Sequence, residues 1–123
     1  MKEKRTALIV DDSISIRQIV SCTLKEAGFK VLECQNGQEA LDRMADERVD
    51  VVVTDINMPV LNGIHFVRRL RQNPDWQRLP VLVLTTESVE AKKQEAKAAG
   101  ATGWIVKPVH PMSLLGVITK VLT

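Results

Sequence analysis

A chain of 123 residues is long enough to bury the core of one domain, and 45% hydrophobic with 26% charged residues is typical of a globular protein. The 17 basic and 15 acidic residues are spread along the chain, and a formal net charge of +2 excludes the basic footprint of a nucleic-acid-binding or membrane-surface protein. The apolar run near the N-terminus stops at Asp11, too short for a signal peptide, and no run approaches transmembrane length. We therefore expect one domain over residues 1–123, in the cytoplasm and without membrane insertion.

The two cysteines offer no evident redox or metal chemistry. Cys22 and Cys34 have no CxxC spacing and no His beside them. A disulfide framework or a zinc site needs such spacing, so we expect two buried or half-buried thiols.

The first half of the chain predicts three strands and two helices. A side-chain oxygen can cap a helix at Ser13 and again at Asn36, which has Glu39 three residues on as in a capping box. Gly28 is placed to close the first helix in a left-handed conformation. The first helix should bury Ile16, Ile19, Val20, Leu24 and Ala27, which recur at helical spacing. The expected strands are residues 6–10, 30–34 and 51–54, of which the second is less apolar and suits a sheet edge.

The second half of the chain predicts two strands and three helices. Asn62 begins a helix that ends before Pro74. Ser88 caps an alanine-rich helix that ends at Gly100. Pro111 stands where Pro favours the first turn of the last helix. The expected strands are residues 80–84 and 102–106.

This alternation of apolar strands and helices predicts an α/β fold. We expect an open, doubly wound, mostly parallel five-stranded sheet with five helices on its two faces. Ligands of such sheets bind outside the carboxyl ends of the strands, where the strand order switches. Polar residues at the carboxyl ends of the strands should therefore lie along one edge: Asp11, Asp12, Asp55, Thr85 and Lys107.

These side chains together suit phosphoryl chemistry. Three carboxylates in one place repel each other, and a hard divalent cation such as Mg²⁺ relieves that repulsion through oxygen ligands. A carboxylate can also act as a nucleophile that forms an acyl phosphate. Lys107 as a cation and Thr85 as a hydroxyl donor suit the oxygens of a phosphoryl group.

Each residue alone has a simpler interpretation. Asp11 and Asp12 could complement the dipole at a helix start, and Asp55 could merely begin a turn. Lys107 could be a surface lysine, and Thr85 a turn residue. Because these five residues follow the carboxyl ends of separate strands of one sheet, a shared site is the favoured interpretation.

Over essentially its whole length, the chain resembles a response-regulator receiver domain. The residues that carry the resemblance are Asp11-Asp12, Asp55-Ile56-Asn57-Met58-Pro59, Asn62-Gly63, Thr85 and Lys107-Pro108. The resemblance implies a flavodoxin-like fold with strand order 2-1-3-4-5. It also implies that the protein is not an enzyme, since it catalyses only phosphoryl transfer to its own Asp55 and hydrolysis of that acyl phosphate.

The resemblance assigns roles to the acids. Asp55 would accept the phosphoryl group from the phosphohistidine of a histidine kinase. Asp12, Asp55 and the backbone carbonyl of Asn57 would hold Mg²⁺, with Asp11 acting through water.

The resemblance also assigns residues that carry the signal onward. Thr85 and Lys107 would contact the phosphoryl group and transmit its arrival. Trp104 takes the position of an aromatic residue, usually Tyr or Phe, that swings inward in the family. Alternatively, Trp104 is a half-buried strand residue that packs and never switches. Asn57 and Glu87 match positions that tune the access of hydrolytic water to the acyl phosphate.

Within the family, residues 84–87 and 103–108 are similar to single-domain chemotaxis regulators, which implies a role in chemotaxis or motility. The implied partners are a sensor histidine kinase, a phosphatase and an output protein such as a flagellar motor switch component. The family's usual binding face would here show Lys92, Lys93, Lys97, Trp104 and Lys120. Lysines on an alanine-rich helix are also common on ordinary solvated faces. We expect a monomer, because no exposed apolar stripe demands a partner.

Three alternatives stay open. A hydrolase of the haloacid-dehalogenase type also uses an aspartate nucleophile with Mg²⁺, but it needs a second acid two residues on, where this chain has Asn57. A flavin-binding electron carrier would need aromatic residues around the flavin, and this chain has no Tyr and two Trp. Inside the receiver family, a shuttle that passes phosphate onward, or a receiver cut from a larger protein, fits the same residues.

Overall fold

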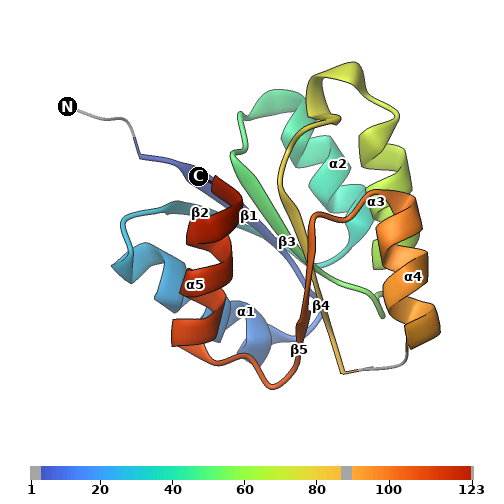
Figure 1. Ribbon diagram of the computed structural model, residues 1–123. Coiled ribbons are helices and arrows are strands. Elements are labelled where there is room, and N and C mark those ends of the chain that lie inside the picture. The colour runs from blue at the N-terminus through green and yellow to red at the C-terminus, as the bar shows by residue number, and fades with distance from the viewer. Residues whose placement is uncertain (1–3, 87–89, 123) are drawn as a thin grey trace.

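The structure is a computed structural model, and it describes residues 4–86 and 90–122. Over these residues, five strands alternate with five α-helices, and a short 3-10 helix follows α3 (Figure 1). The strands are β1 Thr6–Val10, β2 Lys30–Cys34, β3 Val51–Asp55, β4 Val81–Thr85 and β5 Gly103–Val106. The helices are α1 Ile14–Glu26, α2 Gly37–Asp46, α3 Gly63–Arg71, η1 Pro74–Trp76, α4 Glu90–Ala99 and α5 Pro111–Leu122.

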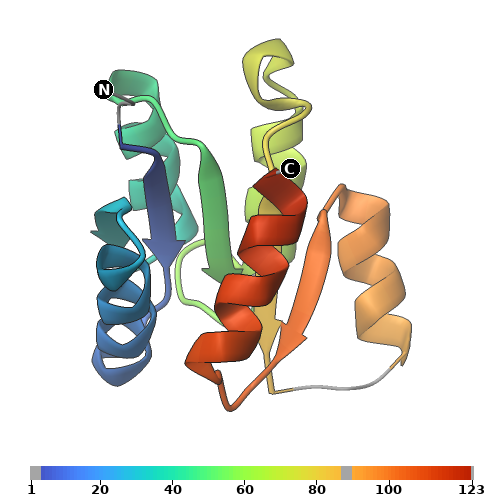
Figure 2. The same cartoon turned by 60° about the vertical axis from the view of Figure 1, so that its left-hand side comes forward.

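The strands form one parallel sheet in the order β2-β1-β3-β4-β5. Helices α1 and α5 cover one face of the sheet, while α2, α3 and α4 cover the other (Figure 1 and Figure 2). This is the doubly wound α/β fold that the alternation of strands and helices predicts, with the strand order that the resemblance implies. In the described part of the chain, every helix is too short or too polar to cross a membrane.

Alternating side chains along the strands build one core on each face of the sheet. Leu8 and Val52 belong to the core beneath α2, α3 and α4, whereas Ala7 and Val51 belong to the core beneath α1 and α5. Strands β3 and β4 are buried along their whole length, as their continuous apolar runs predict. Strand β2 mixes exposed and buried residues and lies at an edge, as expected.

The helix ends follow the signals in the sequence. The side chains of Ser13, Asn36 and Asn62 each accept a hydrogen bond from the backbone N–H three residues on, at 3.4, 2.9 and 2.9 Å. Gly28 follows α1 with a φ of +96°, which confirms the left-handed closure. The predicted cap at Ser88 lies outside the described residues.

The buried stripe of α1 is narrower than predicted. Val20 and Leu24, one helical turn apart, are fully buried against the sheet. Ile19 is 43% exposed, because one residue along a helix turns the side chain about 100° away from that stripe. Ala27 is also exposed, because it follows the last residue of α1. The prediction that Ile19 and Ala27 face inward is therefore wrong.

The two thiols differ in their surroundings. Cys34 is buried in β2, and this burial, followed by the charge of Glu39, raises the pKa of its thiol to about 11. Cys22 is exposed, contrary to the prediction, because it lies two residues after Val20 and thus on the far side of α1 from the buried stripe. Both thiols are free.

Candidate functional site

Three aspartates meet at the carboxyl edge of the sheet. Asp11 and Asp12 follow β1, and Asp55 ends β3. The two strands are neighbours, with Val10 opposite Thr54. One carboxylate oxygen from each aspartate lies within 4.8 Å of the others. The predicted convergence of these carboxylates is therefore confirmed.

Lys107 reaches the same acids from the turn after β5. Its Nζ lies 3.2 Å from Asp11 Oδ2 and 3.3 Å from Asp55 Oδ1. Its backbone N–H donates to the carbonyl of Thr85 at 2.7 Å, which prolongs the contact between β4 and β5. With a side chain only 13% exposed, this lysine bridges the acids of two strands in a largely buried position.

Thr85 and Asn57 lie near Asp55 in different environments. Thr85 is fully buried at the end of β4, one residue past Leu84, which pairs with Asp55. Asn57 is exposed in the loop two residues after Asp55. Both residues thus lie at the carboxyl edge of the sheet, as the sequence predicts.

Trp104 lies further from the acids, within β5. It pairs with Val83 and packs, half-buried, against the core beneath α2, α3 and α4. Its indole Nε1 is buried and has no hydrogen-bond partner among the described residues. A buried donor without a partner costs roughly 1–3 kcal/mol, so packing rather than a polar contact holds this ring.

Burial dominates the electrostatics of Asp55. Its side chain is 8% exposed, and desolvation followed by the charge of Asp11 raises the pKa of its carboxyl above the usual value. Lys107 and the N–H of Ile56, which donates to Asp55 Oδ1 at 2.8 Å, act in the opposite direction without cancelling the increase. The ionised site therefore holds more negative charge than its surroundings offset.

This set of donors fits a small, hard cation. All three ligand groups are carboxylates, and carboxylate oxygens are ligands that Mg²⁺ prefers. Asp11 and Asp55 are buried whereas Asp12 is exposed, so the cluster is open to solvent on one side. A divalent cation at this position would offset the charge that Lys107 alone leaves unbalanced.

The loop after β3 is shaped by close backbone packing. Gly63 donates its N–H to the carbonyl of Ile56 at 2.8 Å, and a Cβ on Gly63 would lie 2.0 Å from the carbonyl oxygen of Asp55. The sequence predicts that a helix begins at Asn62, but it gives no sign of this close approach at Gly63. Val60, exposed in the same loop, has a φ of +70°, a strained conformation for a β-branched residue. Helix α3 can therefore begin beside Asp55 only with glycine at its first position.

Arg17 contacts the backbone of Asp11 but is not among the predicted site residues. Its Nη1 donates to the carbonyl of Asp11 at 2.5 Å, and its Nε lies 3.6 Å from Glu33 Oε1. The sequence does contain a signal for Arg17. It is a basic residue four positions after the capping Ser13, near the start of a helix, where a cation is unfavourable because it opposes the helix dipole.

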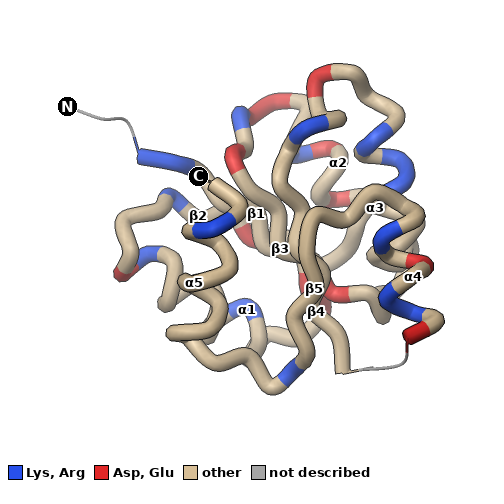
Figure 3. The backbone as a smooth tube through the Cα atoms, viewed as in Figure 1, with Lys and Arg blue, Asp and Glu red and all other residues tan. Residues whose placement is uncertain are grey.

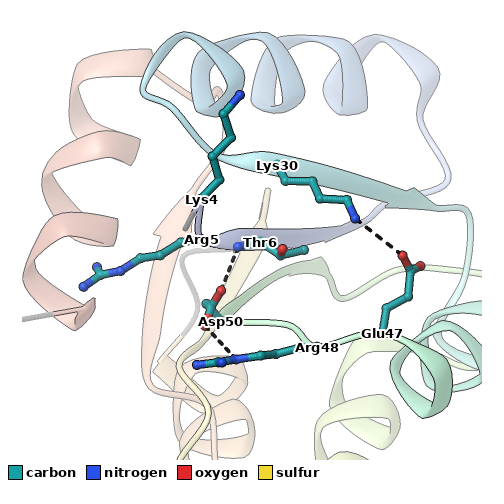
Figure 4. Close-up of a pocket in the computed structure, with 7 residues that line it drawn as sticks. All are labelled: Lys4, Arg5, Thr6, Lys30, Glu47, Arg48 and Asp50. Carbon is teal, nitrogen blue, oxygen red and sulfur yellow. Dashed lines mark hydrogen bonds and ion pairs between the residues drawn. The ribbon is translucent and has the colours of Figure 1, made fainter. Parts of the chain in front are cut away.

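A groove of about 660 Å³ opens at the opposite, amino edge of the sheet (Figure 4). Lys30 Nζ lies 3.8 Å from Glu47 Oε1, and Arg48 Nε lies 3.7 Å from Asp50 Oδ1. Asp50 Oδ2 also accepts the N–H of Thr6 at 2.7 Å. These contacts tie together the amino ends of the first strands, and the groove includes none of the predicted site residues. Its lining residues are Lys4, Arg5, Thr6, Lys30, Glu47, Arg48 and Asp50.

The fold and the acid cluster define a class of signalling protein. Residues 7–119 match the family described as the response regulator receiver domain, and the chain belongs to this family. As a receiver domain it is not a conventional enzyme, which disfavours the hydrolase and the flavin carrier.

Individual relatives of the chain include proteins named for chemotaxis. The chain is 38% identical over 109 residues to the chemotaxis protein CheY1 of Helicobacter pylori, covering 87% of this chain and 88% of that protein. It is 36% identical over 115 residues to the protein PilH of Pseudomonas aeruginosa, covering 94% and 95%. The solved structure of the chemotaxis response regulator CheY4 of Vibrio cholerae is similar with a TM-score of 0.93 at 48% identity, covering 98% of this chain and 100% of that chain.

Proposed function

We propose that this receiver domain is a phosphorylation-dependent switch of a two-component system. Asp55 accepts a phosphoryl group from the phosphohistidine of a sensor histidine kinase, and the phosphorylated domain then binds an output partner. The observation that carries the proposal is the meeting of Asp11, Asp12 and Asp55 with the Nζ of Lys107 at one sheet edge.

Of the two buried acids, Asp55 rather than Asp11 has an oxygen free to act as the nucleophile. Asp11 uses Oδ1 to accept the N–H of Ser13 at 2.9 Å and Oδ2 to contact Lys107. Asp55 uses only Oδ1, for Ile56 and Lys107, and its Oδ2 has no hydrogen bond or ion pair among the described residues. This free oxygen would attack phosphorus as the P–N bond breaks, and the imidazole nitrogen keeps the electron pair and takes a proton from water.

The other site residues have supporting roles in this proposal. Asp11, Asp12, Asp55 and the carbonyl of Asn57 would hold Mg²⁺, with Asp11 acting through water. When bound, Mg²⁺ supplies positive charge that offsets the carboxylates and the phosphoryl oxygens. Lys107 neutralises a phosphoryl oxygen, and the hydroxyl of Thr85 donates to another. Charge neutralisation is the main help that this kind of transfer needs.

The proposed output lies in chemotaxis or motility, as the names of the relatives suggest. Lys93 and Lys97 line a cavity of about 220 Å³ together with Trp104. An acidic partner segment suits this surface, because it offers carboxylates to the lysines. Lys92 and Lys120 would extend the same face, and Thr85 and Trp104 would relay the phosphorylation signal to it.

We further propose that residues 1–123 act as a single cytoplasmic domain and as a monomer before phosphorylation. The family match over residues 7–119 and the inclusion of all five strands in one sheet support a single domain. A phosphatase that shortens the life of the acyl phosphate would complete the switch.

Intrinsic tryptophan fluorescence tests the switch. Acetyl phosphate with Mg²⁺ is expected to change the fluorescence of the wild type, and EDTA should abolish the change. Asp55→Asn should not respond, and Trp104→Phe should lose most of the response while Trp76 remains as an internal reference. A silent wild type, or an equal response from Asp55→Asn, would overturn the proposal.

A further inference from the structure

Arg17 contacts the loop that carries Asp11 and Asp12, here called the acid-bearing loop, through the backbone carbonyl of Asp11. We propose that it is a positioning residue, which aims the carboxylate of Asp12 by fixing the peptide group between Asp11 and Asp12. This inference rests on the proposed function, since it assigns a residue that prepares the cation site without touching the cation.

The backbone of Asp11 is held on both sides. Its N–H donates to the carbonyl of Cys34 at 3.1 Å, which extends the pairing of β1 with β2. Its carbonyl accepts from Arg17 Nη1 at 2.5 Å. The guanidinium is anchored in turn, since its Nε lies 3.6 Å from Glu33 on β2 and its side chain is only 13% exposed. Arg17 thus joins α1, the acid-bearing loop and β2.

Asp12 depends on this backbone contact more than its neighbours do. Asp11 and Asp55 have side-chain contacts to backbone N–H groups and to Lys107. Asp12 is exposed, and its side chain has no hydrogen bond or ion pair among the described residues. The direction of its Cα–Cβ bond is therefore set by the peptide plane before it, and the oxygen of that plane is the one that Arg17 holds.

The charge of Arg17 accounts for its ion pair with Glu33 but not for its contact with the carbonyl of Asp11. A cation near a helix start opposes the helix dipole, and a cation beside three carboxylates competes with Mg²⁺ for them. If Arg17 acted only through its charge, removing it would strengthen Mg²⁺ binding. If it positions Asp12, removing it weakens Mg²⁺ binding. The two roles predict changes of opposite sign.

The test is the affinity for Mg²⁺ alone, measured by isothermal titration calorimetry on the metal-free full chain. The double variant Arg17→Met/Glu33→Gln removes the ion pair without changing net charge. Loss of a residue that orients a metal ligand typically costs 10–100-fold in affinity, so we expect binding at least about tenfold weaker. Arg17→Lys, which keeps one donor, should fall between this variant and the wild type.

Glu33→Gln alone is the matched control. It removes the exposed partner of the ion pair but leaves the bond from Arg17 to the carbonyl of Asp11, so Mg²⁺ affinity should stay within about twofold of the wild type. Thermal melts in EDTA identify any variant that fails to fold. If the double variant does not fold, the Mg²⁺ affinity of Arg17→Lys is compared with that of the wild type instead. Unchanged or tighter Mg²⁺ binding by the folded Arg17 variants would overturn the inference.

The rate of phosphorylation by acetyl phosphate provides a second readout. In the Arg17 variants, the Mg²⁺ concentration for half-maximal rate should rise, while the rate at saturating Mg²⁺ returns close to that of the wild type. A merely structural role would lower the melting temperature without moving the half-saturation point. Absence of Mg²⁺ binding in the wild type would instead refute the proposed function, so the two failures are distinguishable.

Discussion

At the scale of single residues, Asp55 combines a buried position with a charge that its surroundings disfavour. Burial and Asp11 raise the pKa of its carboxyl, and Lys107 compensates only in part. The ionised side chain therefore destabilises the folded protein when no cation is bound. The same unbalanced charge favours the binding of a divalent cation, which then offsets the negative charge of an incoming phosphoryl group.

The first prediction concerns Asp55→Asn in metal-free buffer near pH 7. Removing the charge should raise Tm, by roughly 4 °C for each ~1 kcal/mol of stabilisation in a domain of this size. Thermal denaturation followed by circular dichroism measures the change. Asp42→Asn, on the exposed face of α2, is the control and should change Tm little.

The sign of the pH dependence gives this prediction a second test. The pKa of the Asp55 carboxyl is higher in the folded chain than in the unfolded chain, so protonation of this carboxyl stabilises the folded state. This stabilisation is fully present below the unfolded pKa of about 3.9. That contribution is lost as pH rises through the folded pKa. The advantage of Asp55→Asn should therefore shrink as pH falls toward 4, and an advantage that is constant with pH would contradict this view of the site.

At the scale of elements, α3 is positioned by its first residue. The Cβ of any other residue at Gly63 would meet the backbone of Asp55 and Ile56 at 2.0 to 2.9 Å. Backbone atoms cannot rotate aside as a flexible side chain would. The start of α3 and the end of β3 must therefore separate if a side chain is added at this position.

The second prediction compares two glycines. Gly63→Ala should lower the free energy of unfolding by about 1–3 kcal/mol or more and slow phosphorylation of Asp55, because the loop beside the acid must shift. Gly116→Ala, in α5 with open space around its Cβ position, should be stabilising by roughly 0.5–1 kcal/mol. Urea denaturation measures both, and an equal effect at the two positions would contradict the proposed packing of α3.

The sequence predicts the elements well where one pattern dominates. The five strands of the described sheet begin and end within one residue of their predicted bounds. The caps at Ser13, Asn36 and Asn62 follow from side-chain oxygens at helix starts. The exposure of Ile19 could not be predicted, because the rotation of α1 on the sheet depends on packing. The sequence gives no sign of the 3-10 helix η1, because its single turn is too short to show a period.

At the scale of the whole molecule, the basic last turns of the helices and the acid cluster lie at opposite edges of the parallel sheet. The last turns of α1, α2, α4 and α5 carry Lys25, Arg43, Lys97 and Lys120, which complement the helix dipoles (Figure 3). Because these helices run opposite to the strands, their last turns lie toward the amino edge. The three clustered aspartates lie at the carboxyl edge, where the proposed cation and phosphoryl group bind.

Topology also explains which parts of the site the sequence could predict. Asp11, Asp12, Asp55, Thr85 and Lys107 follow the ends of parallel strands, so their convergence requires only the fold. The contact of Arg17 with a backbone carbonyl and the close approach of Gly63 depend on distances between elements. No pattern of residue types encodes those distances, and only the structure reveals them.

The central claim is that Asp55 carries the phosphoryl group, and chemical trapping tests it most directly. The chain is phosphorylated with acetyl phosphate and Mg²⁺ and then reduced with borohydride, which converts an aspartyl phosphate into homoserine. Peptide mass spectrometry then identifies the modified position. We predict homoserine at position 55 and at neither of the neighbouring acids. Homoserine at Asp11 or Asp12, or a wild type without any trapped residue, would contradict the account.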